Sequence, residues 1–131
     1  MVEQRKSIVY IEDDPDLVDL VKLILGSKDF AVIGAYSGQV GLELVKNNPP
    51  DLILLDLMMP DIDGWEVFKR LKADEFTSQI PIVIISAKAQ PIDQLLGLSI
   101  ARADDYISKP FHPQQLIDSV QKVLSRKQAP R

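Results

Sequence analysis

Several polar side chains of chemically useful types stand where short apolar runs of this sequence end. They are carboxylates, one hydroxyl and one ammonium group: Glu12, Asp13, Asp14, Asp56, Ser86 and Lys109. Asp56 is the most conspicuous of them, because it directly follows four aliphatic residues, 52–55. A carboxylate beside a buried strand is costly unless something compensates its charge. We therefore expect a positively charged partner beside Asp56 and a chemical role for its carboxylate.

The types of these side chains favour a hard cation and an anionic ligand. Carboxylates that lie close together repel one another and need positive charge. The sequence has no cysteine, and its single histidine lies elsewhere, so the available ligands are oxygen atoms. Such ligands suit Mg²⁺ (or Mn²⁺), which keeps several waters and accepts phosphate oxygens. Lys109 adds positive charge that makes sense if a phosphoryl group also arrives.

These side chains can meet only if the apolar runs are neighbouring strands. The middle runs are continuous Ile, Leu and Val, which is typical of parallel strands covered on both faces. Helical patterns separate them. The predicted strands are 7–11, 30–35, 51–55, 81–86 and 105–108, and the predicted helices are 15–25, 37–46, 64–73, 92–101 and 113–124. This alternation predicts an α/β fold in which ligands bind beyond the carboxyl ends of the strands.

Length and composition narrow the function classes. The 131 residues suit one domain, and 46% hydrophobic with 26% charged residues is typical of a soluble globular protein. A net charge of −4 argues against direct nucleic-acid binding. No apolar stretch has the length of a membrane span, and the N-terminus lacks a signal-peptide pattern. We therefore expect a cytoplasmic protein without a membrane partner.

Four segments, in their order along the chain, give a more specific signal: YIEDDPD, DLILLDLMMPDIDGWE, PIVIISAKA and DDYISKPF. Together they resemble the receiver domain of two-component response regulators. The resemblance implies a doubly wound, flavodoxin-like sheet of five parallel strands in the order 2-1-3-4-5, with five helices on its two faces. We expect residues 1–125 to form the receiver domain and residues 126–131 to be a polar tail or linker stub.

The resemblance also implies a phosphoryl-binding site. Asp56 matches the phosphoacceptor, and Asp13 and Asp14 match the acidic pair, with Asp14 binding the metal directly and Asp13 mostly through water. The backbone carbonyl of Met58 would be a further metal ligand, and Lys109 would contact the phosphoryl group.

Two further positions match the conformational switch of that family. Ser86 corresponds to the hydroxyl that moves towards the phosphoryl group, and Tyr106 to the aromatic ring that follows it inward. The resemblance also suggests a cis peptide between Lys109 and Pro110. The usual glycine before the fifth strand is replaced by Arg102, so that turn must either bear some strain or change shape.

The implied function is signalling rather than ordinary enzyme catalysis. A sensor histidine kinase or a histidine phosphotransfer protein would donate the phosphoryl group from a phosphohistidine, with Mg²⁺ as the only cofactor. The switched form would control a downstream protein or an output domain absent from this chain. A phosphorylation-dependent dimer is left open, and the sequence names neither the kinase nor the output.

Three other functions fit the sequence less well. A phosphatase of the dehalogenase-like class also uses a strand-end aspartate, but it needs a second aspartate where this chain has Met58. A nucleotide-binding domain would need a glycine-rich loop after the first strand, which YIEDDPD does not provide. An inactive receiver acting as a scaffold is disfavoured because Asp56, Ser86 and Lys109 are all present.

Two other motifs have simple structural explanations. The segment DIDG resembles part of a calcium loop, but the twelfth position counted from Asp61 is Lys72 instead of glutamate. We expect Asp63 to cap the helix that follows. His112 lies in the turn that enters the last helix, and we expect a surface or capping role for it.

Overall fold

The computed structural model describes residues 5–87 and 102–128, and a five-stranded sheet is at its centre. The strands are β1 (Lys6–Ile11), β2 (Phe30–Ala35), β3 (Leu52–Leu55), β4 (Ile82–Ser86) and β5 (Asp105–Ser108). They are arranged in the order β2-β1-β3-β4-β5, and every neighbouring pair is parallel. The predicted strand order is therefore confirmed.

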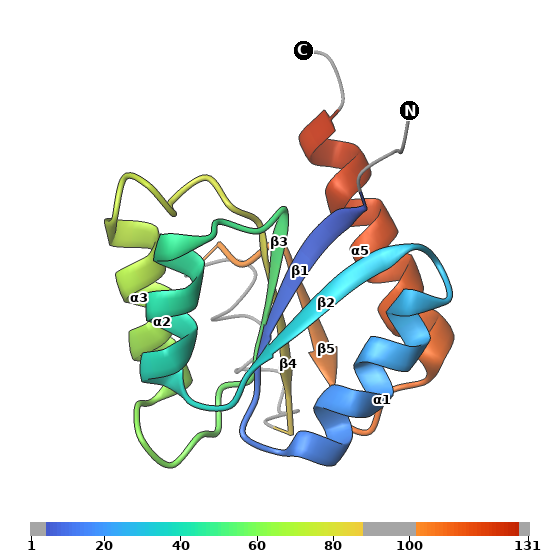
Figure 1. Cartoon of the computed structure of the whole chain (residues 1–131), viewed down its shortest axis with the longest axis horizontal. Helices are drawn as coiled ribbons and strands as arrows, with labels where there is room; N and C mark the ends of the chain where they lie inside the picture. Colours follow the sequence, from blue (N-terminus) through green and yellow to red (C-terminus); the bar gives the residue numbers. More distant parts are fainter. Residues whose placement is uncertain (1–4, 88–101, 129–131) are drawn as a thin grey trace.

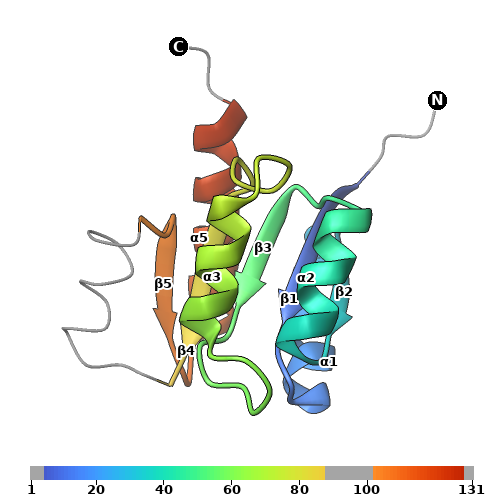
Figure 2. The same ribbon diagram turned by 90° about the vertical axis from the view of Figure 1, so that its left-hand side faces the viewer.

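The described helices cover both faces of this sheet. They are α1 (Pro15–Gly26), α2 (Gly38–Asn47), α3 (Gly64–Ala73) and α5 (Pro113–Gln128). Figures 1 and 2 show α1 and α5 on one face and α2 and α3 on the other. The predicted helix at 92–101 lies outside the described residues. No described helix has both the length and the apolarity needed to cross a bilayer.

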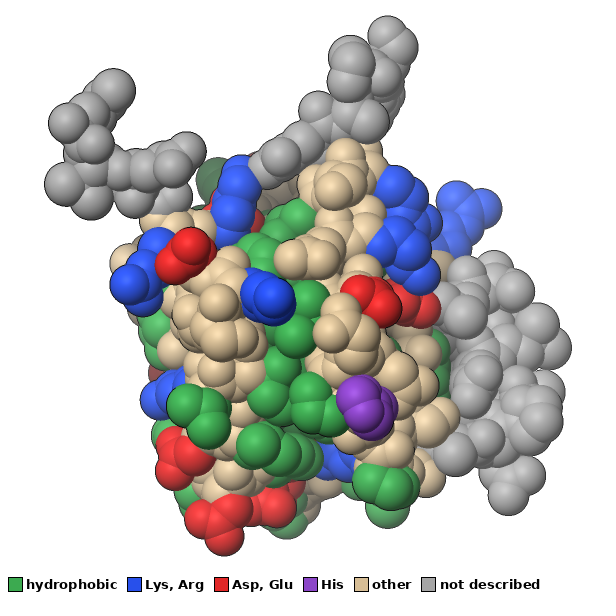
Figure 3. Space-filling model, turned by 90° about the vertical axis from the view of Figure 1, so that its right-hand side faces the viewer, with side chains coloured by type: hydrophobic (Ala, Val, Ile, Leu, Met, Phe, Trp, Pro, Cys, Tyr) green, Lys and Arg blue, Asp and Glu red, His purple; other side chains and the backbone are tan. Residues whose placement is uncertain are grey.

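The sheet separates two hydrophobic cores, because successive residues of a strand point to opposite faces. On β1, Ile8 and Tyr10 belong to the core beneath α1 and α5, whereas Val9 and Ile11 belong to the core beneath α2 and α3. Figure 3 shows the outer surface on the side of α1 and α5, where hydrophobic side chains form a band between charged ones. β1 therefore packs against a hydrophobic core on each of its two faces.

Side chains at the helix ends fix where the helices begin. Asp14 is the N-cap of α1 and Pro15 its first residue, and Ser37 caps α2 through the N–H of Val40. Asp63 caps α3 by accepting the Trp65 N–H at 2.8 Å, which confirms the prediction for the DIDG segment.

Helix α5 ends at Gln128 instead of Leu124, so it extends into the segment that the sequence suggested was a tail. The residues after Leu124 are compatible with a helix, and the Arg126 guanidinium donates to the Asp104 carbonyl at 3.3 Å. The last turn of α5 is therefore linked to the residue that precedes β5.

The turn before β5 has the left-handed conformation that a glycine would normally adopt. Arg102 has a φ of 64°, so it accepts the strained conformation in place of reshaping the turn. Asp29, before β2, has a similar φ of 66°. The peptide between Lys109 and Pro110 is cis, as the family resemblance suggested.

Candidate functional site

The candidate site lies at the carboxyl ends of the strands, and backbone hydrogen bonds fix its residues there. The N–H of Asp56 donates to the Ile11 carbonyl at 3.0 Å, and the N–H of Glu12 donates to the Ala35 carbonyl at 2.9 Å. The N–H of Lys109 similarly donates to the Ser86 carbonyl at 2.9 Å. The backbone hydrogen bonding of the sheet therefore continues one residue past the strands. It fixes the backbone positions from which these three side chains extend.

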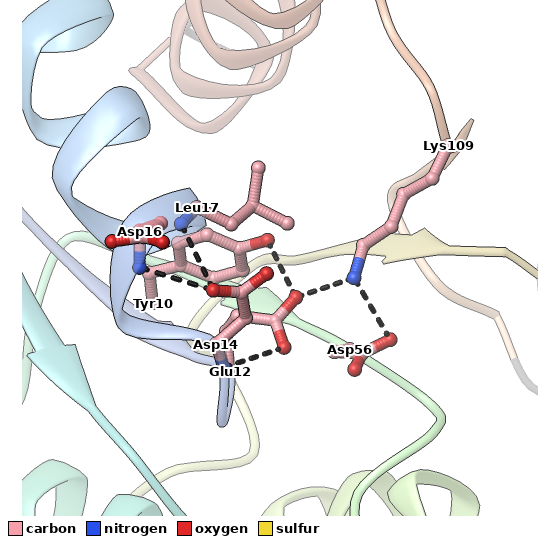
Figure 4. Close-up of polar contacts among 7 residues, drawn as sticks. All are labelled: Tyr10, Glu12, Asp14, Asp16, Leu17, Asp56 and Lys109. Atoms are coloured by element: carbon pink, nitrogen blue, oxygen red, sulfur yellow. Dashed lines mark hydrogen bonds and ion pairs between the residues drawn. The ribbon is translucent and has the colours of Figure 1, made fainter.

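A network of charged groups connects the first, third and fifth strands (Figure 4). The Lys109 ammonium donates a hydrogen bond to Glu12 Oε1, and its nitrogen lies 3.6 Å from Asp56 Oδ1. The Tyr10 hydroxyl donates to the same Glu12 oxygen at 3.1 Å, and the Asp14 N–H donates to Glu12 Oε2 at 3.3 Å. The side chain of Glu12 is almost fully buried, and both of its carboxylate oxygens accept hydrogen bonds.

Asp56 is less well satisfied than Glu12. Its side chain is buried, and among the described residues Oδ1 has no hydrogen-bond partner. Burial raises the pKa of Asp56, although the Lys109 charge and a hydrogen bond from the Met58 backbone act in the opposite direction. A buried, incompletely compensated carboxylate is a position where an added cation would be strongly stabilised.

Three carboxylates lie close enough to share such a cation. Oxygens of Glu12, Asp13 and Asp56 all lie within 4.8 Å of one another. Burial and the neighbouring Glu12 carboxylate raise the pKa of Asp13 as well. An all-oxygen set of a few carboxylates fits Mg²⁺ or Mn²⁺, which also bind water and phosphate oxygens.

Comparison with known proteins agrees with this geometry. Residues 8–121 match the family described as "Response regulator receiver domain". The chain belongs to this family. It is thus a signalling phosphoacceptor domain and not a conventional enzyme.

Individual relatives show the same similarity over most of this chain. The chain is 38% identical over 121 residues to the response regulator GtcR of Aneurinibacillus migulanus, covering 92% of this chain and 48% of GtcR. It is 41% identical over 128 residues to the DNA-binding response regulator MtrA of Mycolicibacterium smegmatis, covering 96% of this chain and 54% of MtrA. This receiver domain therefore spans about half the length of these relatives.

Solved structures share the fold. The receiver domain of Francisella response regulator 1452 superposes with a TM-score of 0.87 at 27% identity, covering 95% of this chain and 100% of that chain. A CheY-like receiver domain protein of Methanospirillum hungatei gives a TM-score of 0.85 at 26% identity, covering 94% of this chain and 96% of that chain.

The carboxylates that lie together in this receiver domain differ by one member from the predicted metal set. Asp14, which the sequence analysis placed in the metal set, accepts the N–H groups of Asp16 and Leu17 at 3.0 and 3.4 Å and so caps α1. The cluster instead contains Glu12 with Asp13 and Asp56. The cue was available, because a proline at the first helical position makes the residue before it the N-cap.

Of the remaining predicted residues, Ser86 lies at the same edge of the receiver domain, whereas Tyr106 lies two residues before the end of β5. Ser86 is fully buried at the end of β4, and Tyr106 is partly buried against the core beneath α2 and α3. Met58 lies in the loop after Asp56 with an exposed side chain, and the role of its carbonyl as a metal ligand stays a prediction. His112 Nδ1 accepts the Gln114 N–H at 3.2 Å, which confirms a capping role.

Two contributors to the site were not found in the sequence. Tyr10 looked like an ordinary core residue within an apolar run, and no local signal shows that its hydroxyl reaches Glu12. Gly64 was expected only as the first residue of a helix. A Cβ there would lie 2.3 Å from the Cα of Leu57, so only glycine lets the loop after Asp56 close onto α3.

Proposed function

We propose that this receiver domain accepts a phosphoryl group on Asp56 from a phosphohistidine of a sensor histidine kinase or a histidine phosphotransfer protein. The observation that carries the proposal is the state of Asp56 Oδ1. It is buried, it has no hydrogen-bond partner within residues 5–87 and 102–128, and it lies 3.6 Å from Lys109 Nζ beside Glu12 and Asp13. Family membership supports the same role.

The chemistry requires positioning more than proton transfer. An Asp56 oxygen attacks the phosphorus, the bond from phosphorus to the donor imidazole nitrogen breaks, and that nitrogen keeps the electron pair. Lys109 can follow the negative charge from the carboxylate to a phosphoryl oxygen, because its ammonium already lies at this edge.

Glu12, Asp13, Asp56 and the Met58 carbonyl are the groups that would hold Mg²⁺ or Mn²⁺. The bound metal would neutralise part of the charge on the phosphoryl oxygens. Glu12 replaces Asp14 in this set because Asp14 is engaged at the start of α1. Tyr10 and Lys109 keep the Glu12 carboxylate at the edge of the sheet.

The response would pass through Ser86 and Tyr106. Phosphorylation adds a charge of about −1.5 to −2 and three acceptor oxygens beside the end of β4. Movement of the Ser86 hydroxyl towards one of these oxygens would open space for the Tyr106 ring, which stands opposite Ile84 on the neighbouring strand. The surface around β5 and α5 would then differ between the two states.

The output would lie outside this receiver domain. The chain spans about half the length of its curated relatives, one of which is named as a DNA-binding regulator. We propose that residues 1–125, together with the continuation of α5 to Gln128, form the signalling unit in the cytoplasm. It would control an output domain beyond this chain or a separate protein, and any DNA binding would belong to that part.

Intact mass after incubation with acetyl phosphate and Mg²⁺ tests the proposal. We expect one phosphoryl adduct in the wild type and none in Asp56→Asn. Asp51→Asn is the matched control, since Asp51 lies at the opposite end of β3. An adduct that persists in Asp56→Asn would refute the assignment.

The same assay separates the two acidic residues that compete for the metal set. Glu12→Gln should raise the Mg²⁺ concentration needed for half-maximal phosphorylation by about tenfold or more, as loss of a ligand or its close partner does. Asp14→Ala should leave it nearly unchanged while it weakens the start of α1 by about 1 kcal/mol. The reverse order would restore Asp14 as the ligand.

A further inference from the structure

A second acidic residue in the loop after Asp56 makes long-range contacts that the proposed chemistry does not use. Asp61 Oδ1 accepts the Gly38 N–H at 3.0 Å, and Asp61 Oδ2 accepts the Gln39 N–H at 3.1 Å. These are the first two residues of α2. The helix therefore has a local cap, Ser37, and a remote cap supplied by the loop that follows β3.

Close packing reinforces this contact. A Cβ at Gly38 would lie 3.1 Å from the Ile62 Cβ and 3.0 Å from a Val67 methyl group. Ile62 also packs against the core beneath α2 and α3. The loop and the start of α2 therefore fit together through the absent side chain of Gly38, the partly buried Ile62 and two charge-assisted hydrogen bonds.

The position of Asp61 within the loop gives the contact its consequence. At the start of the loop the Asp56 N–H donates to the Ile11 carbonyl, and at its end the Gly64 N–H donates to the Leu57 carbonyl at 3.0 Å. Met58 lies between Asp56 and Asp61. Loss of the Asp61 contacts would leave both ends of the loop anchored but would release its middle.

We propose that Asp61 is a positioning residue for the phosphoacceptor site. It ties the loop segment that carries Met58 to the N-terminus of α2, and so sets the metal affinity of the site and its rate of phosphorylation. This inference rests on the proposed role of Asp56. Because coupling between sites is reciprocal, Mg²⁺ binding should in turn protect the Gly38 and Gln39 amides from hydrogen exchange.

The test compares Asp61→Ala with Ser37→Ala. Both variants remove a cap from the same end of α2, but only the first releases the loop. We expect Asp61→Ala to raise the Mg²⁺ Kd, followed by Trp65 fluorescence, by about tenfold, the effect typical of residues that orient metal ligands. Ser37→Ala should change the Kd by less than about twofold, although it lowers thermal stability comparably.

Amide hydrogen exchange gives a second measurement. Its response to Mg²⁺ would not change if Asp61 did no more than cap the helix. In the wild type and in Ser37→Ala, adding Mg²⁺ should slow exchange at Gly38 and Gln39, whereas in Asp61→Ala it should not. Asp61→Asn keeps one acceptor oxygen and should give an intermediate Kd. If Asp61→Ala does not fold, a wild-type Kd in Asp61→Asn overturns the proposal.

The outcomes also distinguish this inference from the proposed function. Equal Mg²⁺ affinities in Asp61→Ala and Ser37→Ala, with phosphorylation still confined to Asp56, overturn the inference alone. A wild-type domain that acetyl phosphate does not modify overturns the proposed function itself.

Discussion

The two ends of the sheet treat their acidic residues in opposite ways. At the amino end, Asp51 accepts the Ser7 N–H at 2.7 Å, and Asp104 accepts the Ile82 N–H at 2.8 Å. Asp105 accepts the Ser119 hydroxyl at 2.6 Å and lies 3.2 Å from the Lys122 ammonium. Each of these carboxylates joins the start of one strand to another part of the chain.

At the carboxyl end, by contrast, two buried carboxylates share one positively charged partner. Glu12 and Asp56 share the single Lys109 ammonium, and Asp56 Oδ1 has no hydrogen bond within the described residues. The pKa of Asp56 is raised, mainly by burial. That of Asp105 is lowered, because hydrogen bonds from Ser119 and neighbouring groups outweigh its burial. The carboxylates at the amino end are compensated within the fold, whereas Asp56 at the carboxyl end is compensated only in part.

The largest effect is expected where the loop after Asp56 closes onto α3. Gly64→Ala would place a Cβ 2.3 Å from the Leu57 Cα and 2.6 Å from the Asp56 carbonyl oxygen, so backbone must move. We expect a loss of about 3 kcal/mol in the free energy of unfolding, measured in urea. Gly26→Ala is the control at the amino end, because nothing lies within 4 Å of its added Cβ. Equal stabilities of the two variants would contradict this.

A smaller loss is expected at the amino end when an acid is removed. Asp104→Ala leaves the N–H of the buried Ile82 without its acceptor, which should cost about 2 kcal/mol of unfolding free energy. Asp104→Asn keeps an acceptor oxygen and should lose less than half as much. Thermal denaturation of the two variants checks the order, and a harmless Asp104→Ala would show that this end is not held by its carboxylates.

Removing the charge of Asp56 at the carboxyl end should instead increase the free energy of unfolding. Asp56→Asn removes a buried charge whose Oδ1 has no hydrogen-bond partner in the part of the chain that the structure describes, while Lys109 keeps Glu12 as its partner. In metal-free buffer at pH 7 we expect the variant to be about 1 kcal/mol more stable than the wild type, although it no longer accepts a phosphoryl group. A destabilised Asp56→Asn would remove the contrast between the two ends.

The smallest effect concerns the pH dependence of Asp105. Because its folded pKa is lowered from the usual value of 3.8, the ionised group stabilises the fold above that value. This stabilisation is lost as the pH falls through the folded pKa. The stability difference between wild type and Asp105→Asn should therefore be largest near pH 7 and shrink below about pH 4. Urea denaturation from pH 7 to pH 3 measures it, and a constant difference would be inconsistent with the lowered pKa.

The sequence by itself determined the alternation of strands and helices. The continuous apolar runs and the helical spacing depend only on neighbouring residues, so β2, α3 and β5 match the predicted ranges residue for residue. The ends of the same apolar runs also placed Asp56, Ser86 and Lys109 at the carboxyl ends of strands. In a parallel sheet these ends all lie at one edge, so the three residues were expected there together.

Only the tertiary structure decided which of these groups meet. Glu12 and Lys109 are 97 residues apart, and Asp61 reaches Gly38 across 23 residues, so no local pattern encodes either contact. The choice between Glu12 and Asp14 has the same origin. Two acids only two positions apart have the same chemistry, but the chain turns between the end of β1 and the start of α1. That turn leaves Glu12 inside the buried edge and directs the Asp14 carboxylate to the helix amides.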